Sequence, residues 1–576
     1  MTNICRIMIA DREYKSWNLV DPDTYVPVRE EESKQIIPSE LKLFTNDLIS
    51  ICPPKLIHSP TRTMQIPAIL VLEGNKTYGR TKNNKRLLYK CIPNDRYLPA
   101  FLVPYAPEIG FSKITQNRFV VFQFDYWDGI HPCGMLVENL GEVGNLSAFY
   151  EYQLYCRSLH NSITEFNKAA KTVVQKTAVD HLFAEAIATE RSRIFSIDPS
   201  GATDQDDAFS IEYLSPTRRR VRVYIANVFV CLERLNMWKS FSNRVSTIYL
   251  PDFKRPMMPT ILSENTCSLT EGKNRPALCM ETEVDLESKT VDSEKTRFFV
   301  ETIKVDKNYA YETRNLLEDR DYKQLLHCTR MLDNSVEDSS DVVSFWMIQM
   351  NETCGEMMEK RGTGIFRQAS FHPDTKLSEE PITMKDMIDS LPEKLAASSK
   401  RLIANWKRST GQYSVFNKDR PIEHATMGKQ AYVHITSPIR RIVDLLNQII
   451  FHREFALIEN ISSDAMVFVE HWLGQLDYIN TTMRSIKKVQ LDCDMIHRCV
   501  SHPEWIDRNH NGVVFDRIRK TDGMYSYMVH LTELNILGRI TTQEKYDNYD
   551  LLNIRIFLFQ DEELLHRKIR LTVVDE

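Results

Sequence analysis

The sequence predicts a multidomain α+β protein, with small β-barrels towards both ends and a mixed α/β part between them. Three observations lead to this prediction. The chain has 576 residues, which is too long for one ordinary domain. Alternating apolar residues dominate residues 65–155 and return from about residue 510. Residues 300–400, in contrast, are charged and rich in helix formers.

Composition and charge limit the class of protein. Hydrophobic residues make up 42% of the chain and charged residues 26%, which is ordinary for a soluble globular protein. The chain has no run of about 18 apolar residues, and its N-terminus lacks a signal-peptide core. We therefore expect no membrane partner and a cytoplasmic location, with the nucleus as an alternative. The net charge of −5 argues against a basic outer surface but allows an enclosed basic channel for nucleic acid.

The N-terminal part is expected to contain a leader followed by β structure. Residues 1–60 mix polar and charged runs with little periodicity, and we interpret them as an extended leader. Residues 65–155 contain short strand-like runs, a strong hairpin pattern over 118–136 and clustered aromatic residues. Such features suit OB-type barrels, which hold single nucleic-acid strands by stacking and phosphate contacts. A plain β-barrel, with its aromatic residues in the core, is the alternative.

A basic, asparagine-rich turn lies within this region. Its side chains Lys82, Lys85 and Arg86 are candidates for contacts to a nucleic-acid backbone. A solvated turn without a ligand explains the same residues equally well.

Four aspartates form the clearest chemical signal of the chain. They follow the spacing D-x5-D-x-D-D and are Asp198, Asp204, Asp206 and Asp207. Pro199 and Gly201 favour a tight turn after the first of them, so the loop can fold back and bring the carboxylates together. Grouped carboxylates repel one another unless a cation neutralises them, and oxygen ligands suit Mg²⁺, with Mn²⁺ as an alternative. A solvated acidic turn is the other interpretation, and a calcium loop fits poorly because its glycine and glutamate are missing.

Regular elements are expected on both sides of the aspartates. A helix is predicted over 178–190, and a strand over 218–227 pairs with 207–213 across a basic turn. A long helix over 475–500 precedes the final β-strands.

A second polar segment follows at residues 432–447. Thr436 or Ser437 can cap a helix that has Pro438 at its start. Arg440 and Arg441 would then lie in the first turn, where free backbone N–H groups and guanidinium groups together bind phosphate. The segment therefore predicts a phosphate site.

Three segments resemble the RNase II (RNB) family of exoribonucleases, which includes the catalytic subunit associated with the eukaryotic exosome. The acidic segment resembles the signature IDP-x4-D-x-DDA, and the segment at 432–447 resembles HFTSPIRRYAD-(L/I)-x-x-H. Residues 247–277 resemble T-x-Y-L followed by LCSL and R-x-A, with Tyr249 as the tyrosine. The resemblance covers about residues 65–576.

The resemblance implies a domain order. Cold-shock-like OB-type barrels would occupy residues 61–160, an α/β RNB catalytic domain 161–505 and a C-terminal OB-type, RNA-binding barrel 506–576. The leader at 1–60 is too short for the additional nuclease domain that exosome-associated relatives carry in front. We expect a monomer, and membership of an exosome-like assembly stays open.

The resemblance also implies an activity, the processive, Mg²⁺-dependent hydrolysis of single-stranded RNA from its 3′ end to 5′-nucleoside monophosphates. Asp198 and Asp207 would chiefly hold the metal, and Asp204 would share the ligation or hold a second ion. Asp206 would complete a two-ion site and align the attacking water. Arg440 would stabilise charge on the scissile phosphate.

RNA contacts are implied in the same way. Tyr249 would clamp the 3′-terminal base by stacking, with a core tyrosine as the alternative. Phe366, in a short strand at 362–367, would stack on a further base. Arg441 and His434 would support the phosphate, although a structural histidine explains His434 equally well.

Three residues depart from the family pattern, namely Asn227, Ile442 and Asn447. Because of this drift, a catalytically silent RNA-binding or scaffold protein on the same fold is the second hypothesis. A DNA-directed nuclease is the third.

Overall fold

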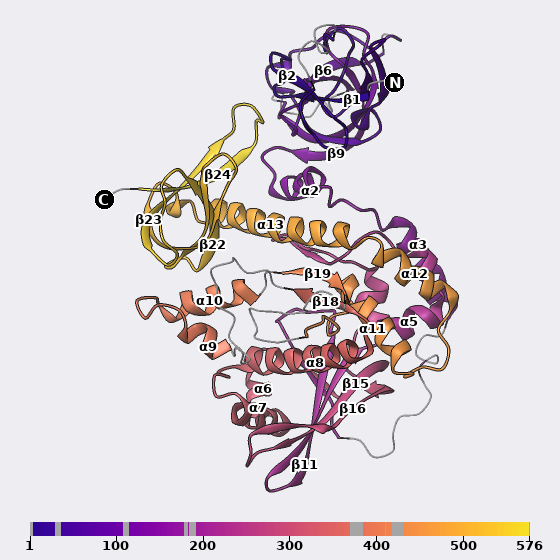
Figure 1. Ribbon diagram of the computed structural model, residues 1–576, viewed down its shortest axis with the longest axis vertical. Coiled ribbons are helices and arrows are strands. Elements are labelled where there is room, and N and C mark those ends of the chain that lie inside the picture. The colour runs from indigo at the N-terminus through magenta and orange to yellow at the C-terminus, as the bar shows by residue number, and fades with distance from the viewer. Residues whose placement is uncertain are drawn as a thin grey trace. The chain divides into compact units, whose positions relative to one another are not determined.

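The structure is a computed structural model (Figure 1) that describes residues 4–28, 36–83, 85–106, 115–177, 183, 192–368, 384–408, 411–417 and 431–574. The chain divides into two units. One comprises Met1–His160, Leu491–His510 and Asn553–Glu576, and the other comprises Asn161–Gln490 and Asn511–Leu552. Both contain sheets and helices, which confirms the predicted α+β class.

The first residues form an antiparallel sheet, so the predicted leader over 1–60 is wrong. Strands β1 (Ile4–Ile9), β2 (Trp17–Val20), β3 (Leu48–Ser50) and β4 (Lys55–His58) lie in the order β2-β1-β3-β4. Cys5, Ile7 and Ile9 alternate along β1 and are buried in a core with Leu19 and Ile49. This alternation spans one strand of 6 residues among polar loops, which is too short to dominate the sequence pattern.

A closed barrel follows this sheet. Its strands are β5 (Gln65–Leu70), β6 (Leu87–Pro93), β7 (Phe101–Tyr105), β8 (Arg118–Tyr126) and β9 (Cys133–Glu142), in the order β5-β6-β7-β9-β8. The predicted hairpin over 118–136 is confirmed, because β8 and β9 pair antiparallel with Phe124 opposite Gly134. Phe44 packs in the barrel core on Phe101 and Trp127, with ring centroids 5.6 and 5.0 Å away.

Helices α2 (Leu146–Cys156) and α3 (Thr164–Lys176) come after the barrel. Asn145 caps α2 by accepting the Ala148 N–H through its side chain. The helix predicted over 178–190 lies outside the described residues, apart from residue 183.

The central sheet of the second unit contains the acidic segment. Its strands are β10 (Phe195–Asp198), β11 (Asp207–Ser215), β12 (Arg218–Ala226), β15 (Asn274–Asp285), β16 (Thr290–Lys304) and β17 (Lys307–Ala310), in the order β16-β15-β12-β11-β10-β17. The predicted pairing of 207–213 with 218–227 is confirmed, with Asp207 opposite Ile225. Strand β10 runs antiparallel to β11 and parallel to β17.

Helices and two small sheets follow, and all of them lie in this unit except the part of the last helix after Gln490. The helices are α5 (Val228–Leu235), α6 (Arg314–Glu318), α7 (Arg320–Leu332), α8 (Ser339–Arg361), α9 (Met384–Asp389), α10 (Ala397–Arg408), α11 (Ile442–Glu454), α12 (Ser463–Leu473) and α13 (Leu476–Ser501). The small sheets pair β13 (Ile248–Tyr249) with β14 (Lys254–Arg255) and β18 (Ile365–Gln368) with β19 (Gln412–Val415). The short strand near 362–367 and the long helix over 475–500 are confirmed; of the helical region predicted over 300–400, the described residues from Arg314 on are mostly helical, whereas 300–304 and 307–310 belong to strands β16 and β17.

The C-terminal region is a five-stranded sheet, as the alternation from residue 510 predicts. Its strands are β20 (Asn509–Arg519), β21 (Tyr525–Leu531), β22 (Ile536–Thr542), β23 (Leu551–Gln560) and β24 (Arg567–Val573), in the order β22-β21-β20-β23-β24. In the part of the chain that the structure describes, no helix is long and apolar enough to cross a membrane.

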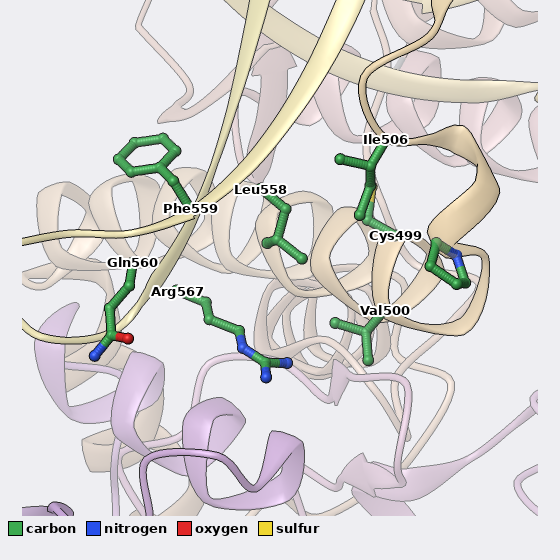
Figure 2. A pocket seen from close by; sticks show the side chains of 8 residues that line it. Cys499, Val500, Ile506, Leu558, Phe559, Gln560 and Arg567 are labelled. Carbon is green, nitrogen blue, oxygen red and sulfur yellow. The ribbon is translucent and has the colours of Figure 1, made fainter.

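A pocket of about 320 Å³ lies between the end of α13 and the β23–β24 hairpin (Figure 2). Its wall is mostly apolar and includes Val500, Ile506 and Leu558. Figure 2 shows Arg567 lying between Gln560 and Val500.

Candidate active site

The acidic segment lies where two neighbouring strands share an end. Asp198 closes β10 and Asp207 opens β11, and the two strands are antiparallel with Phe195 opposite Phe209. The loop between them turns at Pro199, whose carbonyl accepts the N–H of residue 202 at 3.0 Å. Position 201 has φ of +79°, which glycine adopts without strain. The loop therefore folds back as predicted and brings the carboxylates towards one end of the sheet.

Asp206 connects the two polar segments of the sequence. Its side chain is 2% exposed, and its Oδ1 accepts the Ile439 N–H at 3.0 Å. Its Oδ2 lies 3.1 Å from Nε of Arg440, whose own side chain is 45% exposed. The buried carboxylate thus holds a guanidinium that stays accessible to an anionic ligand.

Burial raises the pKa of three carboxyl groups in the segment. The pKa of Asp206 rises to about 7 because burial outweighs the attraction of Arg440. The pKa of Asp198 rises to about 6, also by burial, although Ser196 donates a hydrogen bond to it at 2.7 Å. Burial and the charges of Asp198 and Asp206 raise the pKa of Asp207 well above its usual value. Such a group is stable in its ionised form only beside a cation.

The donor atoms suit a hard divalent cation. Oδ2 of Asp207 is buried and accepts no hydrogen bond within the described structure, whereas Oδ2 of Asp206 is buried and lies 3.1 Å from Nε of Arg440. Oxygen-only donors favour Mg²⁺ or Mn²⁺. Within the same described ranges, no set of three or more acidic, histidine or cysteine side chains is already arranged as a metal site. The fit therefore rests on the unpartnered Oδ2 of Asp207, the buried carboxylate of Asp206 and the raised pKa values of both groups.

Asp204 has a different partner from the other three aspartates. Nζ of Lys254 lies 2.7 Å from its Oδ1, and it also lies 2.7 Å from the Thr203 hydroxyl and 2.9 Å from Oε1 of Glu264. An ammonium group thus occupies the place beside Asp204 that the sequence interpretation gave to a metal ion. Ligation by Asp204 would have to displace this ion pair.

Arg440 precedes helix α11 and does not lie in its first turn. Arg441 is the N-cap, with extended φ of −139° and ψ of 128°, and no side chain caps the helix. Ser246 forms a β-bridge with Arg441, and the Thr247 N–H donates to the Arg440 carbonyl at 3.0 Å. The Ser437 carbonyl accepts the N–H groups of Arg440 and Arg441 at 3.2 and 3.1 Å, so residues 438–440 form a turn and the helix begins only at Ile442. The predicted helix start at Pro438 is therefore wrong, and phosphate binding beside these arginines stays a prediction.

Tyr249 lies beside Arg440. It belongs to β13, is 43% exposed and pairs across the small sheet with Lys254 of β14. Its hydroxyl accepts a hydrogen bond from the Arg440 side chain, and burial raises its pKa. The hairpin thus places an accessible aromatic ring next to the guanidinium and joins it, through Lys254, to the acidic loop.

Phe366 does not offer a stacking surface. Its side chain is fully buried in β18, and its ring centroid lies 6.1 Å from that of Phe416. The stacking role predicted for Phe366 is wrong, because the ring is enclosed in the core and leaves no face open to a base.

Arg441 and His434 are held by the protein itself. Nη2 of Arg441 donates to Oδ1 of Asp444 at 2.8 Å. His434 is 6% exposed, its Nδ1 lies 2.8 Å from the Tyr413 hydroxyl, and its Nε2 lies 3.1 Å from Nη1 of Arg367. These contacts favour the structural alternative for His434.

One lysine of the basic turn in the barrel contacts other side chains of the protein. Lys82 forms an ion pair with Asp128 at 2.5 Å and lies 4.1 Å from the centroid of the Tyr126 ring. Lys85 and Arg86 are exposed. Lys82 thus already has an acidic partner within the protein, as the alternative without a ligand expects. Lys85 and Arg86 stay candidates for contacts to a nucleic-acid backbone.

The residues that depart from the family pattern keep buried polar contacts. The Asn227 side chain caps α5 by accepting the Val230 N–H at 3.2 Å, and its Nδ2 lies 2.8 Å from Nε2 of His452. Asn447 bonds the N–H and the carbonyl of Ile365, each at 2.9 Å. Both asparagines are completely buried, which is consistent with packing changes.

Two further residues at the site were not found from the sequence. Lys254 lies within the segment at 247–277 that resembles the family but is not one of its matching positions, and its cross-strand pairing with Tyr249 brings it to the loop. Tyr311 donates its N–H to the Asp198 carbonyl at 2.9 Å, and burial together with Asp207 and Asp198 raises the pKa of its phenol. Tyr311 directly follows β17, which runs parallel to β10 and ends beside Asp198. Its position after a strand end is the sequence signal that could have indicated it.

Comparison with known proteins supports the interpretation of these segments. The sequence profile of the RNB domain matches residues 188–325 and 315–455. Ribonuclease R of Thermotoga maritima is 26% identical over 439 residues, which cover 62% of this chain and 58% of that protein. Exosome complex exonuclease RRP44 of Mus musculus is 23% identical over 443 residues, or 65% of this chain and 45% of that protein. The chain thus spans about half of the length of these relatives.

Solved structures share the fold. RNase R of Mycoplasma genitalium in complex with ribose-methylated single-stranded RNA matches with a TM-score of 0.70 at 16% identity, covering 99% of this chain and 100% of that chain. Yeast Ssd1, described as a pseudonuclease, matches with a TM-score of 0.54 at 12% identity, covering 94% of this chain and 78% of that chain. The predicted fold class, with an α/β centre and OB-type domains at both ends, is confirmed.

Proposed function

We propose that this chain, whose residues 188–325 and 315–455 match the RNB domain, is a processive 3′→5′ exoribonuclease that hydrolyses single-stranded RNA to 5′-nucleoside monophosphates. The observation that carries this proposal is the contact of 3.1 Å between Asp206 and Arg440. The two residues come from the two polar segments and meet beside a group of buried carboxylates. A silent RNA-binding protein has no need to keep this costly arrangement.

Arg440 would bind the scissile phosphate. Its guanidinium is fixed by Asp206 and Tyr249, so little conformational freedom is lost when a phosphate binds. A positive charge fixed there stabilises the negative charge that develops on the phosphoryl oxygens. Asp206, on the other side of the contact, would orient the attacking water.

Asp198, Asp206 and Asp207 would hold Mg²⁺, with Mn²⁺ as the alternative. When bound, the ion would offset the carboxylate charges and polarise the phosphate. Asp204 would join the ligation only if the metal ion displaced the Lys254 ammonium group from its carboxylate.

Tyr249 would hold the 3′-terminal base. Its ring is 43% exposed and adjoins Arg440, so a base stacked on it would leave the last phosphodiester near the guanidinium. Stacking of one base is worth about 1–3 kcal/mol. The RNase R of Mycoplasma genitalium was solved with single-stranded RNA, which supports RNA as the polymer.

A gel assay tests the proposal. The full chain is incubated with Mg²⁺ and a single-stranded oligoribonucleotide that carries a 5′ label. We expect the label to move stepwise to a short end product and the deoxy version to persist. Internal cuts, or equally fast degradation of the DNA, would contradict a 3′→5′ exoribonuclease.

A catalytically silent RNA-binding protein is the second candidate. The likeness to yeast Ssd1, described as a pseudonuclease, makes it worth testing, although the likeness shows the fold alone. Tight binding of full-length label without any shortening would favour this candidate. A monomeric state and a cytoplasmic location accompany the proposal as expectations.

A further inference from the structure

A second cluster of charged side chains lies at the opposite end of the β11–β12 hairpin from the acidic segment. A pocket of about 490 Å³ opens there, and it is lined by Arg219, Glu318, Arg320, Lys323, Gln324 and His327. Asp207 opens β11, whereas the hairpin turn follows Ser215. At about 3.3 Å per strand residue, the pocket lies roughly 20 Å from Asp207. It is therefore distinct from the proposed catalytic site.

One face of helix α7 supplies most of the pocket. Residues 320, 323, 324 and 327 follow the three- and four-residue spacing that puts side chains on one side of a helix. Tyr322 and Leu325 lie on the opposite side and are buried, with exposures of 1% and 0%. Burial of that apolar side fixes the rotation of the helix, so the cationic face is held towards the pocket.

The other arginines of β12 are neutralised by the chain's own acids. Arg218, Arg220 and Arg222 lie 2.6 to 3.7 Å from carboxylate oxygens of Glu212, Glu281, Glu283 and Asp285. Their even spacing puts these three side chains on one face of the strand. They form a structural network that needs no ligand.

Arg219 lies on the other face of the same strand. Its Nη1 donates to the carbonyls of Ser215 at 2.6 Å and Arg218 at 2.9 Å, and its Cζ lies 4.4 Å from the centroid of the Tyr213 ring. The guanidinium is therefore already positioned, and a single one of its nitrogens is used. Such a group can bind an anion through its other nitrogens at a low cost in side-chain entropy.

The charges in the pocket are not balanced. Glu318 is the one acid among the lining residues, and Nε of Arg314 already lies 2.8 Å from its Oε1. Arg320, Lys323 and His327 take part in no ion pair with any residue that the structure describes. In contrast to the neighbouring network, this chain supplies cations here without acids to match them.

We propose that this pocket binds a small ligand through its phosphate groups. The fixed guanidinium of Arg219 and that of Arg320 suit bidentate phosphate contacts, and Lys323 adds a point charge. A phosphate monoester carries about −1.5 to −2 charges near neutral pH, which matches this excess of cations. The volume is that of a small-molecule site. Free nucleotides and the terminal 5′-phosphate of an RNA share this chemistry.

The test measures binding of inorganic pyrophosphate to the full chain by isothermal titration calorimetry. EDTA is present, so that metal ions cannot bridge the ligand to the aspartates. We expect saturable binding, and at least tenfold weaker binding after Lys323→Glu. The matched control is Lys360→Glu, on the exposed end of α8 and outside the pocket, which should change the affinity less than twofold. Because this measurement does not use RNA hydrolysis, its result tests the phosphate pocket independently of the proposed nuclease activity.

Two arms identify the natural source of the phosphate. Displacement of pyrophosphate by adenosine 5′-monophosphate supports a free nucleotide, and displacement only by a 5′-phosphorylated RNA supports the RNA end. If Lys323→Glu lowers the melting temperature, Lys323→Gln replaces it and must still weaken binding at least threefold. Absence of saturable binding at millimolar pyrophosphate, or equal affinity in the pocket and control variants, would overturn the proposal.

Discussion

Replacing Asp206 with asparagine should stabilise the metal-free protein at pH 8 while stopping RNA hydrolysis. In the fold, the pKa of this carboxyl is about 7, against a usual value of 3.8. The difference is about 3 units, and each unit corresponds to about 1.36 kcal/mol. Ionised Asp206 therefore lowers the free energy of unfolding by up to about 4 kcal/mol at a pH above 7.

The sign of this effect follows from proton linkage. Between about pH 4 and 7 the folded carboxyl keeps a proton that the unfolded chain has lost, so the stability contributed by Asp206 falls as the pH rises. Asparagine does not titrate, and its Oδ1 can still accept the Ile439 N–H. The variant should thus lose part of this pH dependence. Hydrolysis should fall at least about a thousandfold, because the group that aligns Arg440 and water has lost its charge.

The assay is chemical denaturation in EDTA at pH 6 and pH 8, combined with single-turnover hydrolysis in Mg²⁺. Asp547→Asn is the matched control, since it removes the same charge from a side chain that is 84% exposed. We expect a smaller difference in unfolding free energy between the two pH values in Asp206→Asn than in the control. Equal pH dependence in both variants would refute the reasoning, as would nearly normal turnover in Asp206→Asn.

Three other substitutions separate the roles assigned to neighbouring residues. Tyr249→Ala should lengthen the final RNA product, because a stacking contact worth about 1–3 kcal/mol is lost; an unchanged length on a sequencing gel would remove the clamp role. Lys254→Met should strengthen Mn²⁺ binding severalfold in electron paramagnetic resonance titrations, because the Oδ1 of Asp204 loses the ammonium that lies 2.7 Å away; weaker binding would contradict this. Phe366→Ala should lower the free energy of unfolding by about 3–5 kcal/mol, as expected for a buried ring, and leave the product length unchanged. A normal stability with a longer product would restore the stacking role of Phe366.

Local sequence patterns were sufficient to predict turns and hairpins, whose geometry depends on a few consecutive residues. The proline and glycine after Asp198 predict the turn, and the antiparallel pairing of β10 with β11 then places Asp198 and Asp207 at one end of the sheet. Alternation likewise predicts the hairpin of β11 and β12. In both cases the residues that contact one another are also close in the sequence, so the local pattern contains both partners.

Contacts between distant segments were harder to predict. Capping residues favour a helix from Pro438, but residues 438–440 form a turn and Arg441 then pairs with Ser246 in a β-bridge, a partner that no pattern in 432–447 contains. The ion pair of Lys254 with Asp204 depends on a two-stranded hairpin in the same way. Tertiary pairing overrode the local preference at both places.

Burial of single side chains also escaped the sequence analysis. Phe366 lies in a strand of 4 residues, where alternation cannot tell which face meets the core. The strand β1 was missed for a similar reason, since its alternation is short and surrounded by charge. The face that is buried becomes known only when the neighbouring elements are in place.

Diffraction from crystals of the full chain with Mn²⁺ and a short single-stranded RNA tests the central claim most directly. We predict an anomalous peak beside the buried carboxylates of Asp206 and Asp207, with the terminal phosphodiester within hydrogen-bonding distance of Arg440 and the last base on Tyr249. A manganese peak elsewhere, or an RNA 3′ end that does not approach Arg440, would contradict the account.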